Sequence, residues 1–178
     1  MAVFGQDEDR TLDWSILRDG GISLYRNRKY LGEDMKWLEL QGYRVFSVDC
    51  AAWTSHDALH KSLEEWLSFP AYYGRNFHAL RDCLSDLEVS DDGGLALVLN
   101  SYDVYARGLG ATNQKTGTHD AQTVLHILAE TSRYFLLRGR RFITLVQSDD
   151  PSMSFEGLGG VATQWNRREW LNKDRGLA

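Results

Sequence analysis

The chain has 178 residues, 43% of them hydrophobic, which suits one domain with a buried core and excludes a disordered chain. Its N-terminus lacks a basic segment followed by an apolar run, and no window approaches a membrane span. These features predict a cytoplasmic protein without a membrane segment. Its two cysteines, Cys50 and Cys83, are expected to be reduced thiols rather than a disulfide.

The formal net charge is −5, and its distribution along the chain is uneven. Between positions 82 and 103 there are acidic residues but no lysine or arginine: Asp82, Asp86, Glu88, Asp91, Asp92 and Asp103. Such a region repels nucleic acid and attracts basic proteins. The sequence therefore predicts a protein partner and no direct contact with nucleic acid.

The first third of the chain predicts a strand over 21–27, a helix over 30–42 and a strand over 43–49. A second helix is expected after Thr54, which forms a capping signature with Asp57 three residues later. The expected buried face of this helix comprises Leu59, Leu63, Trp66 and Leu67. Pro70 then ends it, and Asn76 is placed to cap the next helix.

The segment 94–100, GLALVLN, is apolar throughout, which is typical of a strand covered on both faces and paired in parallel. A short helix near 102–106, a loop over 107–118, a long helix from Asp120 and a strand over 141–148 follow. This alternation predicts an α/β layered fold with a small, mostly parallel sheet packed by helices. The tail carries Trp165, Trp170 and Leu171 to dock on its own domain or on a partner.

The helix expected over 76–87 has two different faces. Leu80, Cys83, Leu84 and Leu87 form the apolar face, whereas His78, Arg81, Asp82 and Ser85 form the polar one at i, i+3, i+4 and i+7. Taken alone, the polar face could be solvated surface with a weak pair of His78 and Asp82. The preceding Tyr72 and Tyr73 favour a protein interface, although either tyrosine could instead be a core residue.

The segment FPAYYGRNFHALRDCLSDL, residues 69–87, resembles the signature of the barstar family, intracellular inhibitors of microbial ribonucleases. The matching residues are Pro70, Tyr72, Tyr73, Gly74, Asn76, Ala79, Leu80, Asp82, Cys83 and Leu84. The likeness extends from about Tyr43 to Asp149. It implies a barstar-like domain over 41–150, with an N-terminal strand and helix extension over 1–40 and a C-terminal extension over 151–178.

The resemblance implies a function as an inhibitor rather than an enzyme, without a cofactor or metal. The signature loop and helix would block the active site of a basic microbial ribonuclease or related toxin. Asp82 would face the cationic centre of the nuclease, Tyr72 would pack on its base, and Asn76 would be structural. The expected partner-binding residues are Tyr72, Tyr73, Arg75, Asn76, His78, Arg81, Asp82, Ser85 and Glu130, the last from a weaker match on the long helix.

Two positions depart from the family pattern. His78 stands where the family usually has a second acid, and Arg81 stands where it usually has an aromatic residue. These replacements make the presented face nearly neutral, because one carboxylate is lost and a guanidinium lies beside Asp82. Such a face suits a toxin that carries its own acid, or a target other than a ribonuclease.

Three alternatives belong to other functional classes. His56-Asp57 and His119-Asp120 resemble the dipeptides of metal phosphohydrolases, but both pairs fall where a helix is expected to begin. His78 with Asp82 could serve acid–base catalysis, but no third orienting group is evident. An adaptor of the same fold would use the N-terminal helix and the tryptophan-bearing tail as its interface.

Overall fold

A parallel sheet flanked by helices on both faces is the basis of this computed structural model, which describes residues 11–111, 119–155 and 157–177. The strands are β1 (Ile22–Tyr25), β2 (Tyr43–Asp49), β3 (Gly94–Asn100), β4 (Phe142–Gln147) and β5 (Gln164–Trp165). Their order is β2-β3-β4-β1-β5, and every neighbouring pair is parallel. The expected α/β class is confirmed. Most of the loop expected over 107–118 lies outside the described residues, as does the start of the N-terminal extension.

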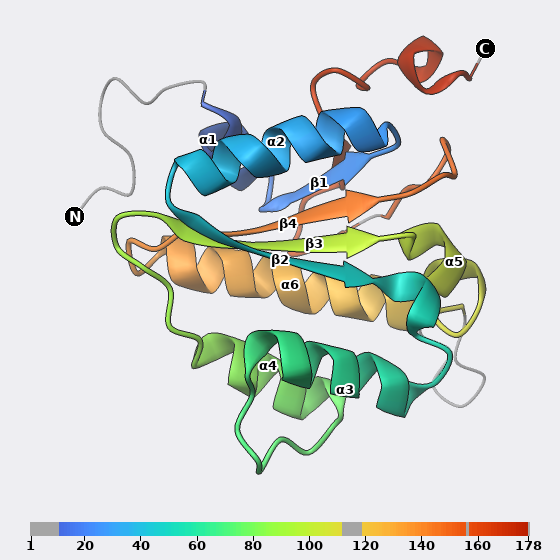
Figure 1. Cartoon of the computed structure of the whole chain (residues 1–178). Coiled ribbons are helices and arrows are strands. Elements are labelled where there is room, and N and C mark those ends of the chain that lie inside the picture. The colour runs from blue at the N-terminus through green and yellow to red at the C-terminus, as the bar shows by residue number, and fades with distance from the viewer. Residues whose placement is uncertain (1–10, 112–118, 156, 178) are drawn as a thin grey trace.

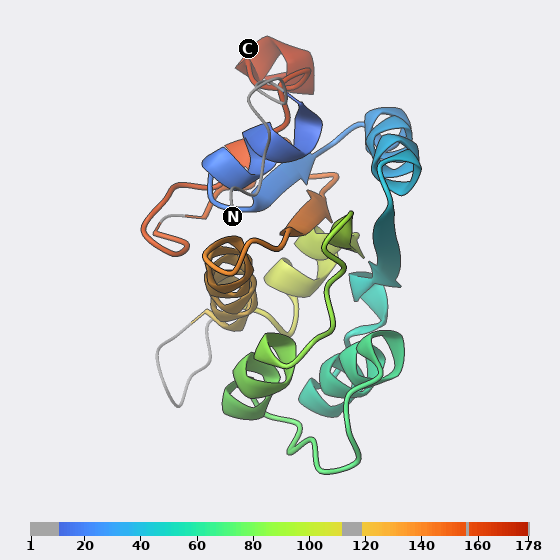
Figure 2. The same ribbon diagram turned by 90° about the vertical axis from the view of Figure 1, so that its left-hand side faces the viewer.

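Most of the helices form two outer layers, one on each face of the sheet (Figure 1). They are α1 (Leu12–Arg18), α2 (Arg28–Leu40), α3 (His56–Leu67), α4 (Phe77–Ser85), α5 (Tyr102–Arg107) and α6 (Asp120–Leu136), with short 3-10 turns η1 (Cys50–Ala52) and η2 (Asn172–Arg175). Helices α1 and α2 lie on one side of the sheet, and α3, α4 and α6 lie on the other (Figures 1 and 2). In the described part of the chain, no helix has the length and apolar character needed to cross a bilayer.

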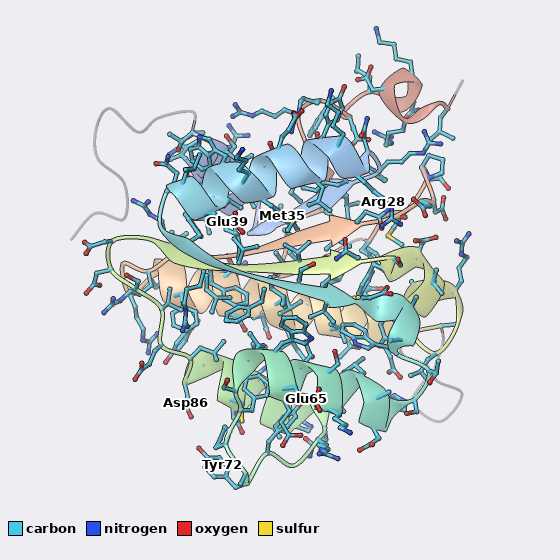
Figure 3. All side chains as sticks on the ribbon, viewed as in Figure 1. Arg28, Met35, Glu39, Glu65, Tyr72 and Asp86 are labelled. Atoms are coloured by element: carbon cyan, nitrogen blue, oxygen red, sulfur yellow. The ribbon has the colours of Figure 1, made fainter. Side chains whose placement is uncertain are left out.

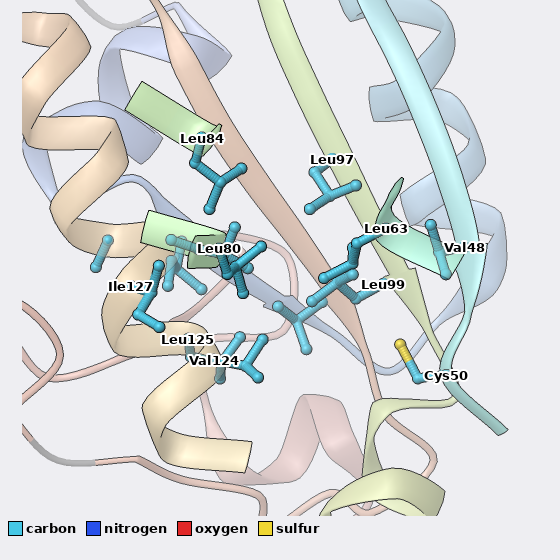
Figure 4. Close-up of a cluster of buried hydrophobic side chains, with 14 of the residues drawn as sticks. Val48, Cys50, Leu63, Leu80, Leu84, Leu97, Leu99, Val124, Leu125 and Ile127 are labelled. Carbon is cyan, nitrogen blue, oxygen red and sulfur yellow. The ribbon is translucent and has the colours of Figure 1, made fainter. Parts of the chain in front are cut away.

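Strand β3 shows why the sheet needs both helix layers. Its apolar residues are all fully buried, and successive side chains point to opposite faces. Leu97 and Leu99 belong to the core beneath α3, α4 and α6, whereas Ala96 and Val98 belong to the core beneath α1 and α2. Figure 4 shows the first core, where Leu80 of α4 and Leu63 of α3 meet these strand residues.

The predicted start and buried face of α3 need two corrections. The cap is Ser55, whose hydroxyl accepts a hydrogen bond from the Ala58 N–H at 3.0 Å, rather than Thr54. Trp66 is 47% exposed, because the buried stripe runs through Leu59, Leu63 and Leu67 at intervals of four residues. Trp66 is therefore a surface residue.

The terminal segments extend the sheet beyond β4. Strand β1 pairs with β4 on one side and with β5 on the other. The backbone N–H groups of Arg26 and Asn27 donate to the buried carboxylate of Glu169 at 3.1 and 2.8 Å. Because the two termini share strand pairing and these hydrogen bonds, they form one addition on the β4 side of the sheet.

Candidate functional site

The loop between α3 and α4 separates the two expected tyrosines. Tyr73 is buried, and its hydroxyl lies 2.5 Å from Nδ1 of the buried His60. Burial lowers the pKa of His60 to about 4, so the imidazole is neutral at pH 7 and shares a hydrogen bond between its Nδ1 and the Tyr73 hydroxyl. Tyr72 instead lies at the loop tip with 77% of its surface exposed (Figure 3). Tyr72 is thus the presented aromatic residue, and Tyr73 holds the loop from inside.

Arg75 fixes the outer side of the same loop. Its backbone has a φ of 46°, in the left-handed region, which turns its side chain back toward α3. The guanidinium donates from Nε to Glu64 at 2.9 Å and from Nη1 to Asp57 at 2.8 Å. These bonds raise the pKa of Arg75 above its ordinary value, with the Glu64 hydrogen bond the largest cause. The structure therefore turns Arg75 toward its own chain.

Helix α4 follows the predicted pattern of two faces. Asn76 caps it by accepting a hydrogen bond from the Ala79 N–H at 2.9 Å, as expected. Leu80, Cys83 and Leu84 are buried, and burial raises the pKa of the Cys83 thiol. The solvent-facing side carries the predicted polar residues His78, Arg81, Asp82 and, half-buried, Ser85, whose hydroxyl donates to the Arg81 carbonyl.

Glu130 of α6 lies beside this polar face. Its Oε2 is 2.7 Å from Nη2 of Arg81, and its Oε1 is 3.3 Å from Nε2 of His126. The other ring nitrogen of His126 accepts a hydrogen bond from the Gly159 N–H at 3.2 Å. Glu130, which the resemblance proposes as a partner-binding residue, therefore contacts Arg81 of α4. The C-terminal segment contacts His126, the other partner of Glu130, through Gly159.

Asp82 differs from these paired groups. It is exposed on α4, and within the described residues its carboxylate makes no hydrogen bond or ion pair. The presented surface thus combines one unpaired carboxylate, one exposed tyrosine and the ion pair of Arg81 with Glu130. A surface of this kind suits recognition of a charged protein partner better than bond-making chemistry.

The residues expected for the rival metal site are used elsewhere. His56 lies at the start of α3, 3.4 Å from the buried Asp120 at the start of α6. Across residues 11–111, 119–155 and 157–177, no cluster of three or more His, Cys, Asp or Glu side chains is arranged to hold a metal ion. His56 and Asp120 instead connect α3 with α6 beneath the sheet.

Sequence reasoning misses four residues that organise this site: His60, Asp57 and Glu64 as loop anchors, and His126 as the partner of Glu130. His126 and Glu130 are four residues apart on α6, a spacing visible in the sequence. His60, Asp57 and Glu64 lie on α3 and contact residues on the other side of the loop, so no local sequence spacing predicts these contacts.

Comparisons with known proteins agree with the signature. The family described as "Barstar (barnase inhibitor)" matches residues 43–147. A protein of Bacillus subtilis (strain 168), named "Putative ribonuclease inhibitor YrdF", is 37% identical over 68 residues, which cover 38% of this chain and 71% of that protein. The matched family region runs from the first residue of β2 to the last residue of β4.

One solved structure also overlays on the chain. A chain of the "Structure of Drosophila ORC bound to AT-rich DNA and Cdc6" matches 76% of this chain, with a TM-score of 0.43 and 19% sequence identity. The match spans 43% of that chain. A likeness at this level supports no conclusion about fold or function.

Proposed function

Because the chain belongs to the barstar family, we propose that it is an intracellular protein inhibitor of a ribonuclease, of the immunity or antitoxin type, acting in the cytoplasm. The Tyr72 loop and helix α4 would enter the active site of the nuclease and block it. The proposed partner is a basic microbial ribonuclease or a related toxin, and neither nucleic acid nor a membrane is bound directly.

The observation that carries this proposal is the joint exposure of the unpaired carboxylate of Asp82 on α4 and of the Tyr72 ring at the tip of the loop that leads into α4. Tyrosine is one of the residue types enriched at the hot spots of tight protein interfaces, because its ring supplies a large contact area with few rotamers. An exposed anion also attracts a basic partner over long range, so it raises the rate of association and suppresses binding to acidic proteins.

The loop is also supported from within, which favours inhibition by a preorganised surface. Tyr73 and Arg75 hold it against α3, and Asn76 starts α4 directly after it. A surface held in its bound conformation loses less entropy on association. We therefore assign Tyr73, Arg75 and Asn76 supporting roles in partner binding, with Tyr72, His78, Arg81, Asp82 and Ser85 as the contacting residues.

The test is a titration of several barnase-like ribonucleases with the purified chain, with RNA cleavage as the readout. Asp82→Asn keeps the shape of the side chain and removes its charge. We expect one-to-one inhibition by the wild type and a weakening of about tenfold or more by Asp82→Asn, because a charged contact of the interface is lost. Added salt should weaken the wild type more than the variant.

The matched control is Glu39→Gln on α2, which removes one exposed carboxylate on the opposite side of the sheet from Tyr72 (Figure 3). Inhibition that falls equally in both variants would assign the effect to net charge rather than to the face. Wild-type chain that leaves every ribonuclease active at micromolar concentration would reject the proposal. The immunity protein of a different toxin, or an adaptor, would then be the function to pursue.

The adaptor alternative has one specific observation in its favour. Trp170 and Leu171 are adjacent in the C-terminal segment and are 55% and 50% exposed. Figure 1 places this segment at the opposite end of the molecule from α4. An adaptor that works through these residues would lose its partner in Trp170→Ser, whereas the proposed inhibitor would retain full inhibition in the same variant.

A further inference from the structure

Both carboxylate oxygens of Glu130 have a partner within the chain. Oε2 pairs with Arg81 at 2.7 Å across the contact between α4 and α6, and Oε1 pairs with His126 at 3.3 Å one helical turn away. Because Nδ1 of His126 accepts from the Gly159 N–H, the neutral ring carries its proton on Nε2, which is the nitrogen facing Glu130. Both oxygens of Glu130 are thus engaged by internal partners, although 40% of its side chain is exposed.

Arg81 differs from Glu130 because its guanidinium has more donors than the ion pair uses. The ion pair engages the Nη2 end of its guanidinium, while 49% of the side chain remains exposed. Asp82, the next residue, is also exposed on α4. A guanidinium presents five N–H donors in a fixed plane, so an arginine held at one end can still bind an acceptor at the other. The face therefore offers a cation and an anion on adjacent residues.

We propose that Arg81 is a specificity-determining contact that binds a carboxylate of the partner, and that Glu130 acts as a positioning residue that holds Arg81 ready. Asp82 and Arg81 together would then recognise an adjacent cation and carboxylate on the partner surface. A uniformly basic surface would pair with Asp82 but would be repelled by Arg81.

This inference rests on the proposed function and narrows its partner. A ribonuclease that works by acid–base catalysis needs cations to bind the phosphate and a base to take the hydroxyl proton. Where that base is a carboxylate, its active site contains the charge pair that this face complements. The inhibitor would then select nucleases with a carboxylate base over nucleases whose cleft carries only cationic and neutral groups.

The experiment measures inhibition constants against the ribonuclease that the wild type inhibits best, at two salt concentrations. The variants are Arg81→Met, which keeps the length of the side chain without its charge, Glu130→Gln, and the double variant. Arg18→Met on α1 is the control, because Arg18 is also an exposed arginine in an ion pair and its loss changes the net charge equally.

We expect Arg81→Met to weaken inhibition about tenfold or more, since a charged contact is lost. Glu130→Gln should weaken it about threefold, since an exposed ion pair contributes modestly. The double variant should match Arg81→Met, because Glu130 acts only through Arg81. Arg18→Met should bind as the wild type does.

Tighter or unchanged inhibition by Arg81→Met would overturn the inference and leave Arg81 as a group that merely masks Glu130. A double variant clearly weaker than Arg81→Met would also overturn it, because Glu130 would then have its own contact with the nuclease. Absence of inhibition by the wild type is a different result, which rejects the proposed function and this inference together.

Discussion

Tyr72 and Tyr73 are neighbours in the sequence, but Tyr72 is exposed and Tyr73 is buried. The pattern YYG predicts an aromatic interface but does not indicate which ring is presented. Tyr73 is selected for the core by tertiary neighbours, since it packs 4.9 Å from the Phe69 ring centroid and bonds to His60. His60 lies thirteen residues away, so its position could not be predicted from local spacing.

His60 gives the first prediction at this scale, that stability falls in mild acid. Its pKa is about 4 in the folded chain because of burial, against about 6.5 in the unfolded chain. Between these values the unfolded chain binds more protons, so the free energy of unfolding rises with pH. His56 and Arg75 nearby also lower the pKa, and Asp57 opposes them. We expect a loss of roughly 1 to 2 kcal/mol between pH 8 and pH 5.

Urea unfolding at both pH values measures this loss. His60→Gln keeps a polar side chain that can accept from Tyr73 but does not titrate, so its unfolding should depend less on pH than that of the wild type. An equal pH dependence in both proteins would assign the effect to other groups.

At the scale of elements, helix α4 is predictable because its determinants are local. The Asn76 cap, the apolar stripe and the polar face all follow from spacing within one helix, and the structure confirms them. The sequence also predicts that Arg75, two residues after Tyr73, binds the partner. Its ion pairs with Asp57 and Glu64 depend on how the loop folds back on α3, which local sequence does not encode.

Arg75 therefore gives a prediction about loop order. Arg75→Met should leave global stability nearly unchanged, because exposed ion pairs contribute little. Amide hydrogen exchange over residues 70–76 should nevertheless accelerate, and inhibition should weaken about threefold or more as the loop loses preorganisation. The control is Lys61→Met on α3, whose ion pair with Glu65 lies outside the loop. Equal exchange rates in wild type and Arg75→Met would contradict the anchoring role.

Two elements, α1 and β5, are absent from the sequence prediction. Helix α1 has seven residues and ends at Arg18, so its apolar pattern completes barely two turns. Strand β5 has two residues and forms only because β1 offers an open edge beside it. Their existence depends on tertiary packing. By contrast, β2 and β3 match the prediction residue for residue: each is preceded by a glycine, and β3 is a continuous apolar run.

At the scale of the whole molecule, the terminal segments complete a single sheet. The sequence predicts an extension at each end of a barstar-like domain over 41–150, and that division remains a prediction. In the structure, β1 and β5 continue the sheet of β4, and Gly159 donates a hydrogen bond to His126 next to the candidate site. Removal of residues 152–178 would therefore disturb the sheet as well as the tail, so point variants test the roles of this segment more cleanly than truncation.

Glu169 provides the point variant. Its side chain is 1% exposed and accepts hydrogen bonds from two backbone N–H groups at the end of β1 and from Asn166. Glu169→Gln removes the charge and one acceptor oxygen, so at least one buried donor loses its partner.

We expect Glu169→Gln to lower the free energy of unfolding by about 2 kcal/mol, measured by urea unfolding, and Glu39→Gln to leave it unchanged. Since Glu169 lies in the C-terminal segment after β5 and contacts the residues that follow β1 rather than α4, the folded variant should still inhibit its nuclease fully. Unchanged stability would show that the C-terminal segment is not fastened through Glu169, and reduced inhibition by the folded variant would show that the segment acts on the partner directly.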